Sequence, residues 1–272
     1  MTSSARESSW DTGQPVMFIR FARGVRKWFY TTSDRIETLN GDTYTPAAIS
    51  RGAIHQGSER AQNNITITLP ASLGVAGNWR PYPPADAVVV TIWVRHVGET
   101  DTIADWTGRV VGPKFNGAEL ELTCEPTLTK ARRLGMQRTW QRGCGLVLYQ
   151  QGVGQCNLNK ATRAVAATLT GMTGLTLTAT AFGTLPDGRF AGGFITWAEG
   201  DGLIESRSIR SHTGTSIVVD YGATALAAGL AVTAYPGCAH TWADCAYFGN
   251  QPNYGGDLWI PRDDPYSGDP VW

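Results

Sequence analysis

Two pairs of cysteines are the residues of this sequence whose type and spacing could support chemistry. Cys144 and Cys156 enclose eleven residues, and Cys238 and Cys245 enclose six. Four thiolates suit a tetrahedral zinc ion or an iron–sulfur cluster, because soft metals prefer sulfur ligands. The spacings exceed those of zinc ribbons, which favours a cluster held by loops, although His240 offers zinc another candidate ligand. Spacing alone leaves a further alternative, in which these are buried and unlinked thiols.

The fifth cysteine, Cys124, has a different setting. It lies in the segment AELELTCEP, where Leu120, Leu122 and Cys124 share one face of a predicted strand. We interpret Cys124 as a core residue without special chemistry. The sequence contains no H-E-x-x-H, no G-x-S-x-G and no glycine-rich phosphate loop, so it predicts no catalytic site and a protein that is not an enzyme.

The composition narrows the class of protein. The chain has 272 residues, and its 23 Lys and Arg balance its 23 Asp and Glu, so we expect no direct nucleic-acid binding. The polar N-terminal segment has no apolar core of a signal peptide, and no apolar run approaches the ~20 residues of a membrane span. We therefore expect a chain without membrane insertion, made in a reducing cytoplasm, where cysteines more often bind metals than form disulfides.

Strand patterns and turn residues predict an all-β fold. Residues 15–22 and 25–32 read as a hairpin, and residues 65–69 alternate between Ile or Leu and Thr. Six further candidate strands lie between residues 164 and 237, with a clear turn at 199–202. We expect two β-barrel or sandwich-like domains and an irregular aromatic- and proline-rich C-terminal tail. The N-terminal domain covers 1–133, and the cysteine-containing domain covers 134–272 with a β-barrel insert at about 160–236.

Two charge clusters of opposite sign flank the second domain. A basic cluster and an acidic tail could meet within one chain or across a subunit interface, although both could equally be solvated surface. The basic cluster comprises Lys130, Arg132, Arg133, Arg138 and Arg142. The acidic residues are Asp244, Asp257, Asp263, Asp264 and Asp269.

The order of these segments resembles a known family of virion proteins. The similarity follows WTGRVVG, then RTWQRGCGLVLYQQGVGQCNLNK, then a β insert and GCAHTWADCAYFGNQPNYGGDLWIP. The last segment is the most specific, with two cysteines, an aromatic-x-Asn triplet, NYGG and WIP in succession. The whole pattern resembles the tail-tip hub proteins of phages with long non-contractile tails, of the lambda tail-tip L type, and of gene transfer agents.

The resemblance implies a structural role in the virion. In that family four cysteines hold a [4Fe-4S] cluster, and the matching positions here are Cys144, Cys156, Cys238 and Cys245. The family also implies a homotrimer at the tail tip, assembled in the host cytoplasm. Its partners would be the distal tail protein ring and the central tail fibre or tip protein, and its barrels would match the tail-tube fold.

Two alternatives stay open from the residues themselves. One is a zinc-stapled or iron–sulfur redox protein, which would need an open coordination position or a substrate pocket. The other is a secreted β-sandwich binding module with two disulfides, against which the odd number of cysteines and the lack of a signal peptide count.

Overall fold

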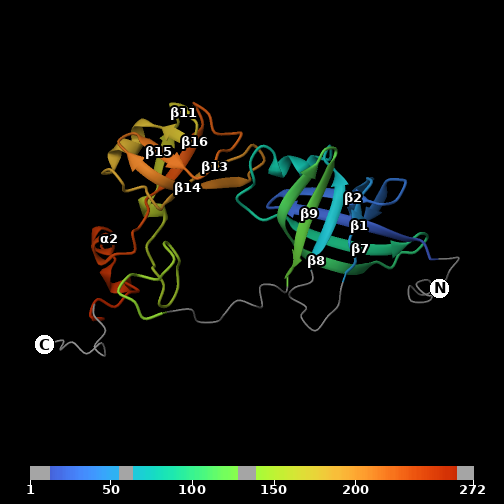
Figure 1. Cartoon of the computed structure of the whole chain (residues 1–272), viewed down its shortest axis with the longest axis horizontal. Coiled ribbons are helices and arrows are strands. Elements are labelled where there is room, and N and C mark those ends of the chain that lie inside the picture. Colours follow the sequence, from blue (N-terminus) through green and yellow to red (C-terminus); the bar gives the residue numbers. More distant parts are fainter. Residues whose placement is uncertain (1–12, 55–63, 128–138, 262–272) are drawn as a thin grey trace. The chain divides into compact units, whose positions relative to one another are not determined.

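The computed structural model describes residues 13–54, 64–127 and 139–261. The chain divides into two compact units, Met1–Leu134 with Glu199–Leu203, and Gly135–Ala198 with Ile204–Trp272. Strands account for 41% of the structure and helices for 10%, which confirms the all-β prediction (Figure 1). Each unit is built on its own sheet and has its own hydrophobic core.

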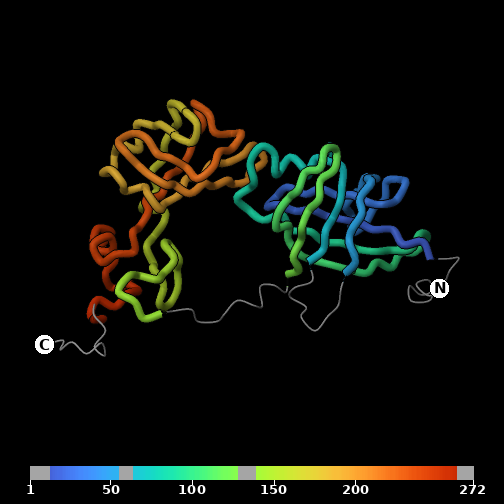
Figure 2. The backbone as a smooth tube through the Cα atoms, in the orientation of Figure 1, coloured from blue at the N-terminus to red at the C-terminus, as the bar shows by residue number. Residues whose placement is uncertain are grey.

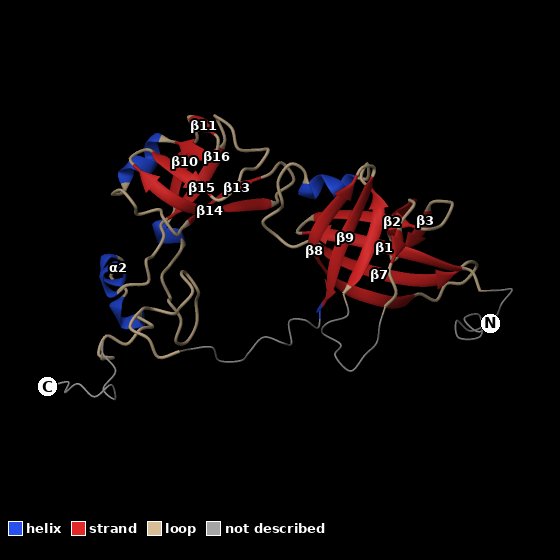
Figure 3. Ribbon diagram, viewed as in Figure 1, coloured by secondary structure: helices blue, strands red, loops and turns tan. Residues whose placement is uncertain are grey.

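The N-terminal unit is a curved nine-stranded sheet in the order β3-β4-β2-β1-β7-β8-β9-β6-β5 (Figure 3). All its pairings are antiparallel except that of β2 with β4. Its strands are β1 (Pro15–Arg23), β2 (Arg26–Thr31), β3 (Glu37–Leu39), β4 (Asp42–Pro46), β5 (Ser50–Arg51), β6 (Ile65–Pro70), β7 (Val89–His96), β8 (Ile103–Asn116) and β9 (Glu119–Pro126). A 3-10 helix, Gly74–Trp79, lies between β6 and β7.

The alternation of side chains along these strands fixes which face is buried. On β6, Ile65, Ile67 and Leu69 are buried, whereas the intervening threonines are exposed or half-buried. The partner strand β9 places Cys124 opposite Ile65, and Cys124 is fully buried. The interpretation of Cys124 as a core residue is therefore confirmed, and burial raises the pKa of its thiol to about 12.

The C-terminal unit contains a seven-stranded sheet in the order β10-β16-β13-β14-β15-β12-β11. Only Leu169 and Thr170 separate β10 from β11, so one stretch of chain pairs with β16 at one end and β12 at the other. The sheet thereby closes on itself as a small barrel. Its strands are β10 (Val165–Thr168), β11 (Gly171–Thr173), β12 (Thr176–Thr178), β13 (Phe194–Ala198), β14 (Ile204–Thr213), β15 (Ser216–Val219) and β16 (Ala231–Tyr235).

Most predicted segments of this barrel contain strands, with one difference. The predicted turn at 199–202 joins β13 to β14, as expected. Thr180 and Ala181, predicted as the end of a strand, instead belong to a 3-10 helix (Thr180–Thr184) that buries Phe182. The barrel interior is filled by apolar side chains that include Phe190, Ile195, Trp197 and Ile217.

Within the C-terminal unit, residues 139–160 and 236–261 lie outside the barrel, and we call them together the cysteine module. Figure 2 shows the first segment, in yellow-green, running beside the second, in red, below the barrel of the same unit. Its regular elements are the helix α2 (Trp242–Tyr247) and a 3-10 helix (Gln251–Asn253), and another 3-10 helix (Ala161–Arg163) leads into the barrel. The sequence patterns predicted no helix at 242–247, and the predicted irregular tail begins only after α2, at Phe248. The helix begins where the Thr241 hydroxyl accepts a hydrogen bond from the Asp244 amide.

None of the helices in the described ranges is long and apolar enough to cross a membrane.

Candidate metal centre

The four cysteines of the two predicted pairs line one hollow of the cysteine module. They share it with Leu146, Leu148, Leu158, His240, Thr241, Phe248, Asn250, Asn253 and Tyr254. The hollow is small, with a volume of about 20 Å³, because the side chains around it nearly fill it. The fold therefore brings together residues from Cys144 to Tyr254 that are far apart in the sequence.

Backbone pairing between the two segments of the module produces this convergence. The Cys144 amide donates to the His240 carbonyl at 2.8 Å, and the Asp257 amide donates to the Gln141 carbonyl at 2.9 Å. Cys245 lies on α2, and its amide donates to the Thr241 carbonyl. His240 has a φ of 57° in the left-handed region, which turns the chain between Cys238 and α2.

Three of the four sulfur atoms accept hydrogen bonds from N–H groups. The Gly255 amide lies 3.3 Å from the Cys144 sulfur, and the His240 amide lies 3.3 Å from the Cys238 sulfur. The Asn250 side-chain nitrogen lies 3.6 Å from the Cys156 sulfur. N–H donors favour the anionic thiolate over the thiol and are a usual part of the surroundings of metal-bound sulfur.

Burial and repulsion from neighbouring thiols oppose ionisation of Cys245 and Cys238. Burial raises the pKa of Cys245 to about 11, and the neighbouring Cys144, Cys238 and Cys156 contribute to that increase. Burial likewise raises the pKa of Cys238, with Asp244 and the other cysteines acting in the same direction. No Lys or Arg is among the described residues that line the hollow. Four thiolates at this place therefore require a bound cationic group to balance their charge.

Four cysteine thiols are a donor set that could hold either a thiolate-bound cluster or a single ion. In the described part of the chain, no three His, Cys, Asp or Glu residues lie close enough to hold one metal ion. A four-iron cluster is wider than one ion, so its ligands would lie further apart. All five cysteines are described, and all five are free rather than paired in disulfides.

The cysteine module has little hydrophobic core of its own. Its buried cluster consists of Tyr149, Leu158 and Phe248, against which Cys156 and Cys238 are packed. The Tyr149 hydroxyl donates to the Pro236 carbonyl at 2.7 Å and ties the two segments of the module together directly after the end of β16. A body of this size with so few buried side chains is stabilised in other small proteins by disulfides or metals.

Sequence reasoning marked the residues around the sulfur atoms only as motifs of the family resemblance and assigned them no role. Asn250 ends the aromatic-x-Asn triplet, and Asn253 and Gly255 belong to NYGG, in a segment otherwise interpreted as an irregular tail. Gly255 and Gly256 pack so closely that a Cβ on either would overlap Leu146 or the Arg142 carbonyl, respectively. The glycine pair Gly255–Gly256, which follows Cys238 and Cys245 in the sequence, is the signal that could have predicted this close approach.

The predicted meeting of the charge clusters falls mostly outside the described residues, since 128–138 and 262–272 hold most of them. Of the described members, the Arg142 guanidinium donates to the Ile260 carbonyl at 2.9 Å, so the chain around Arg142 does lie beside the start of the tail. Asp244 pairs instead with Arg189 of the barrel at 3.0 Å.

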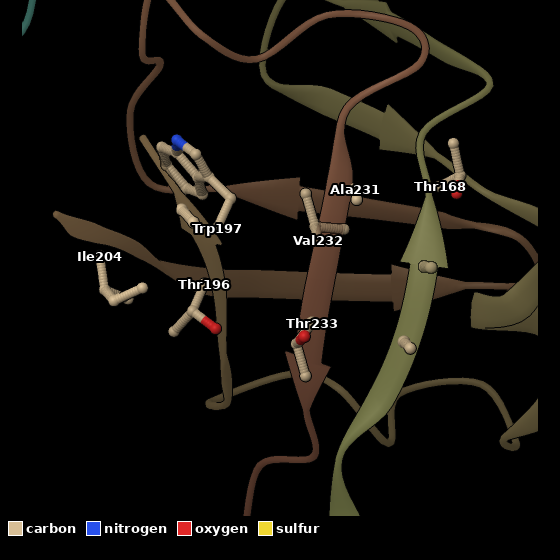
Figure 4. Close-up of a pocket in the computed structure, with 10 residues that line it drawn as sticks. Thr168, Thr196, Trp197, Ile204, Ala231, Val232 and Thr233 are labelled. Carbon is tan, nitrogen blue, oxygen red and sulfur yellow. The ribbon is translucent and has the colours of Figure 1, made fainter. Parts of the chain in front are cut away.

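A second hollow lies on the outer face of the barrel and has a different character. It is a shallow groove of about 490 Å³ formed by β10, β13 and β16, and Figure 4 shows Thr196 and Thr233 next to one another on neighbouring strands. Its remaining lining is Ala166, Ala167, Thr168, Trp197, Ala198, Ile204, Ala231 and Val232. No acid, base or thiol lines this groove, so it offers no constellation for catalysis.

Comparisons of the sequence with known proteins found a phage family model and an uncharacterized relative. A family model described as "Phage conserved hypothetical protein BR0599" matches residues 188–264, a range that includes Cys238 and Cys245. An uncharacterized protein of Xylella fastidiosa (strain 9a5c) is 36% identical over 171 residues, which is 58% of this chain. The chain spans about a third, 36%, of the length of that relative.

The fold also resembles a chain of known structure. That chain belongs to a structure titled "Virion of native gene transfer agent (GTA) particle". The TM-score is 0.78, and the match covers 98% of this chain and 95% of the other, with 19% sequence identity. The two chains therefore share a fold along nearly their full length.

Proposed function

We propose that this chain is a structural virion protein of a phage-like particle. The observation that carries the proposal is the shared fold over 98% of the chain with a gene transfer agent virion chain. The match of residues 188–264 to a phage family model supports it independently of that structure.

The specific role that we propose is that of a tail-tip hub. The chain would form a homotrimer that joins the distal tail protein ring to the central fibre or tip protein. Two β-rich units in each of three chains give six similar bodies, which suits contact between a three-fold tip and a six-fold tail tube.

Within this role, the cysteine module would be stapled by an iron–sulfur cluster on Cys144, Cys156, Cys238 and Cys245. When bound, the cluster would supply charge balance and four bonds that link both segments of the module. This proposal is supported by the shared hollow, the N–H donors to sulfur and the small core of the module. The function of the site would be structural, because metal binding contributes directly to folding free energy where no site exists in the unfolded chain.

Labelling of assembled particles tests the virion role. A peptide tag inserted after Gly41, in the exposed turn between β3 and β4, would be detected by antibody and electron microscopy of purified particles. We expect one label site at the distal end of the tail. Label along the tail or on the capsid would contradict the hub role, and particles without label would contradict the virion role.

Metal analysis of protein purified without oxygen tests the staple. We expect iron and acid-labile sulfide in near-equal amounts, with a visible absorption band that disappears in a Cys238→Ser variant. Zinc without sulfide would indicate a single-ion site in place of the cluster. A protein that contains neither iron nor zinc would contradict the staple. Substrate turnover coupled to reversible reduction would favour the redox alternative.

A further inference from the structure

Three asparagine side chains of the cysteine module form a hydrogen-bonded chain that ends at Cys156. The Asn250 amide nitrogen donates to the Cys156 carbonyl at 2.6 Å and lies 3.6 Å from the Cys156 sulfur. The Asn253 side-chain nitrogen donates to the Asn250 side-chain oxygen at 2.8 Å. Asn157 in turn donates to the Asn253 side-chain oxygen at 3.4 Å.

A backbone group at the far end sets the direction of this chain. The Gly152 amide donates to the Asn157 side-chain oxygen at 2.8 Å. A backbone N–H can only donate, so the oxygen of Asn157 must face Gly152 and its nitrogen must face Asn253. By the same argument, the Asn253 oxygen faces Asn157 and its nitrogen faces the Asn250 oxygen. The Asn250 nitrogen therefore faces Cys156. The orientation of an amide is often ambiguous, but here one backbone donor determines all three.

Asn250 also connects the two halves of the cysteine set. Its backbone amide donates to the Cys245 carbonyl at 2.9 Å, while its side chain holds the Cys156 carbonyl. Asn250 thus contacts the backbone at one cysteine from each pair. Asn157, next to Cys156, has a φ of 54°, a left-handed conformation that Asn adopts more readily than most residues.

The donor to Cys156 differs in kind from the other two. Cys144 and Cys238 accept hydrogen bonds from backbone amides, which no substitution removes directly. Cys156 receives its N–H from a side chain, so its contribution can be deleted by mutation. Hydrogen bonds to cluster sulfur are one of the factors that set the reduction potential of an iron–sulfur cluster, because they stabilise the more negative, reduced state.

We propose that Asn250 is a positioning residue, oriented by Asn253 and Asn157, that holds Cys156 in the ligand set and raises the reduction potential of the bound group. This inference rests on the proposed cluster site. It assigns a role to three polar residues of the module beyond that of the four cysteines.

The test measures the midpoint reduction potential of the loaded protein in four forms: wild type, Asn250→Ala, Asn253→Ala and Asn159→Ala. Asn250→Ala removes the donor, and we expect a more negative potential. Asn253→Ala keeps the Asn250 side-chain donor but removes the hydrogen bond that orients it, so we expect a smaller shift of the potential with the same sign. Asn159 is exposed, is not among the residues that line the hollow, and accepts its side-chain hydrogen bond from the Ala161 amide, so Asn159→Ala should leave the potential unchanged.

The outcomes separate this inference from the proposal beneath it. A wild-type protein without iron and sulfide would overturn both. A loaded Asn250→Ala protein with wild-type potential would overturn the inference alone, even if its melting temperature fell. If Asn250→Ala fails to retain iron, the Asn253→Ala potential decides: a negative shift supports the inference, and no shift overturns it.

Discussion

The barrel and the cysteine module belong to one compact unit, yet they are stabilised in different ways. The barrel closes its sheet through β10 and β11 and fills its interior with side chains such as Phe190 and Ile195, which are fully buried. The module has one short helix, loops and three buried residues in its cluster. At roughly 25 cal/mol per Å² of buried apolar surface, the larger buried cluster of the barrel contributes more stability than that of the module. Under the proposed staple, the four cysteines would supply cross-links that the module otherwise lacks.

Removal of one cysteine ligand should have the largest effect, and it should act on the module alone. We expect Cys245→Ser to lose the bound iron, since the sulfur lies in the shared hollow. The free energy of local opening in the module should then fall by at least about 3 kcal/mol, because metal binding contributes directly to folding. Amide hydrogen exchange, resolved by segment, would measure this opening free energy.

The matched control for this loss is Cys124→Ala. Cys124 lies in the core of the N-terminal sheet, so its truncation should cost roughly 1–2 kcal/mol there and leave the iron content unchanged. Equal loss of protection in the barrel and the module after Cys245→Ser would contradict the contrast between the two bodies.

The connection from β16 into the module should be the next most sensitive point. Gly237 packs against Ala191 and Gly193 so closely that an added Cβ would overlap the Ala191 carbonyl. We expect Gly237→Ala to cost about 3 kcal/mol, as overpacking does, and to lower the iron content by displacing Cys238. Thermal unfolding and iron analysis would measure both effects.

Gly171 in β11 provides the comparison for that variant. An added Cβ there meets no atom within 4 Å, and the residue has no left-handed conformation. Gly171→Ala should therefore change stability by less than about 1 kcal/mol. If both variants behave alike, the close approach at Gly237 is not what fixes the position of Cys238.

A smaller loss is expected when the Tyr149 hydroxyl is removed. Tyr149→Phe leaves the buried Pro236 carbonyl without its donor, which should cost about 1–3 kcal/mol. Tyr235→Phe is the matched control, since Tyr235 is only half-buried and keeps its stack on Phe194, and it should cost less than about 0.5 kcal/mol. Chemical denaturation at pH 7 would compare the two variants.

The same tyrosine predicts a pH dependence. Burial raises the pKa of Tyr149 above its ordinary value near 10, so the folded state disfavours the phenolate. The stability that this provides is complete below about pH 10 and is lost as the pH rises further. Tyr149→Phe should therefore lose less stability than the wild type between about pH 10 and 12. An identical alkaline decline in both proteins would argue against a buried hydroxyl at this position.

The smallest expected effect concerns the ion pair between the barrel and α2. Arg189 lies 3.0 Å from Asp244, both side chains are about four-fifths buried, and the Arg189 guanidinium stacks on Tyr247. A double-mutant cycle with Arg189→Gln and Asp244→Asn should give a coupling of about 1 kcal/mol. The exposed pair Arg210–Asp220 on the barrel should give a coupling nearer zero. Equal coupling in the two pairs would show that the contact with α2 has no special strength.

The sequence by itself determined the elements whose signals are local. Alternation along 65–69 and 120–124 predicted which side chains face the core, including Cys124, and turn residues at 199–202 predicted a hairpin. These predictions succeeded because the side chains of a strand alternate between faces whatever surrounds it. The helix α2 was missed because six residues are too few to display a 3.6-residue period.

Only the tertiary structure decided how distant segments meet. Closure of the barrel depends on pairing between β10 and β16, which lie about sixty residues apart, and no local pattern specifies that register. Spacing marked the four cysteines as candidates but left zinc, a cluster and unlinked thiols open. Their shared hollow, and the asparagine aimed at Cys156, result from backbone pairing and close glycine contacts between two segments separated by an entire barrel. Such contacts are non-local, so they are decided by packing and not by the residues that precede or follow each cysteine.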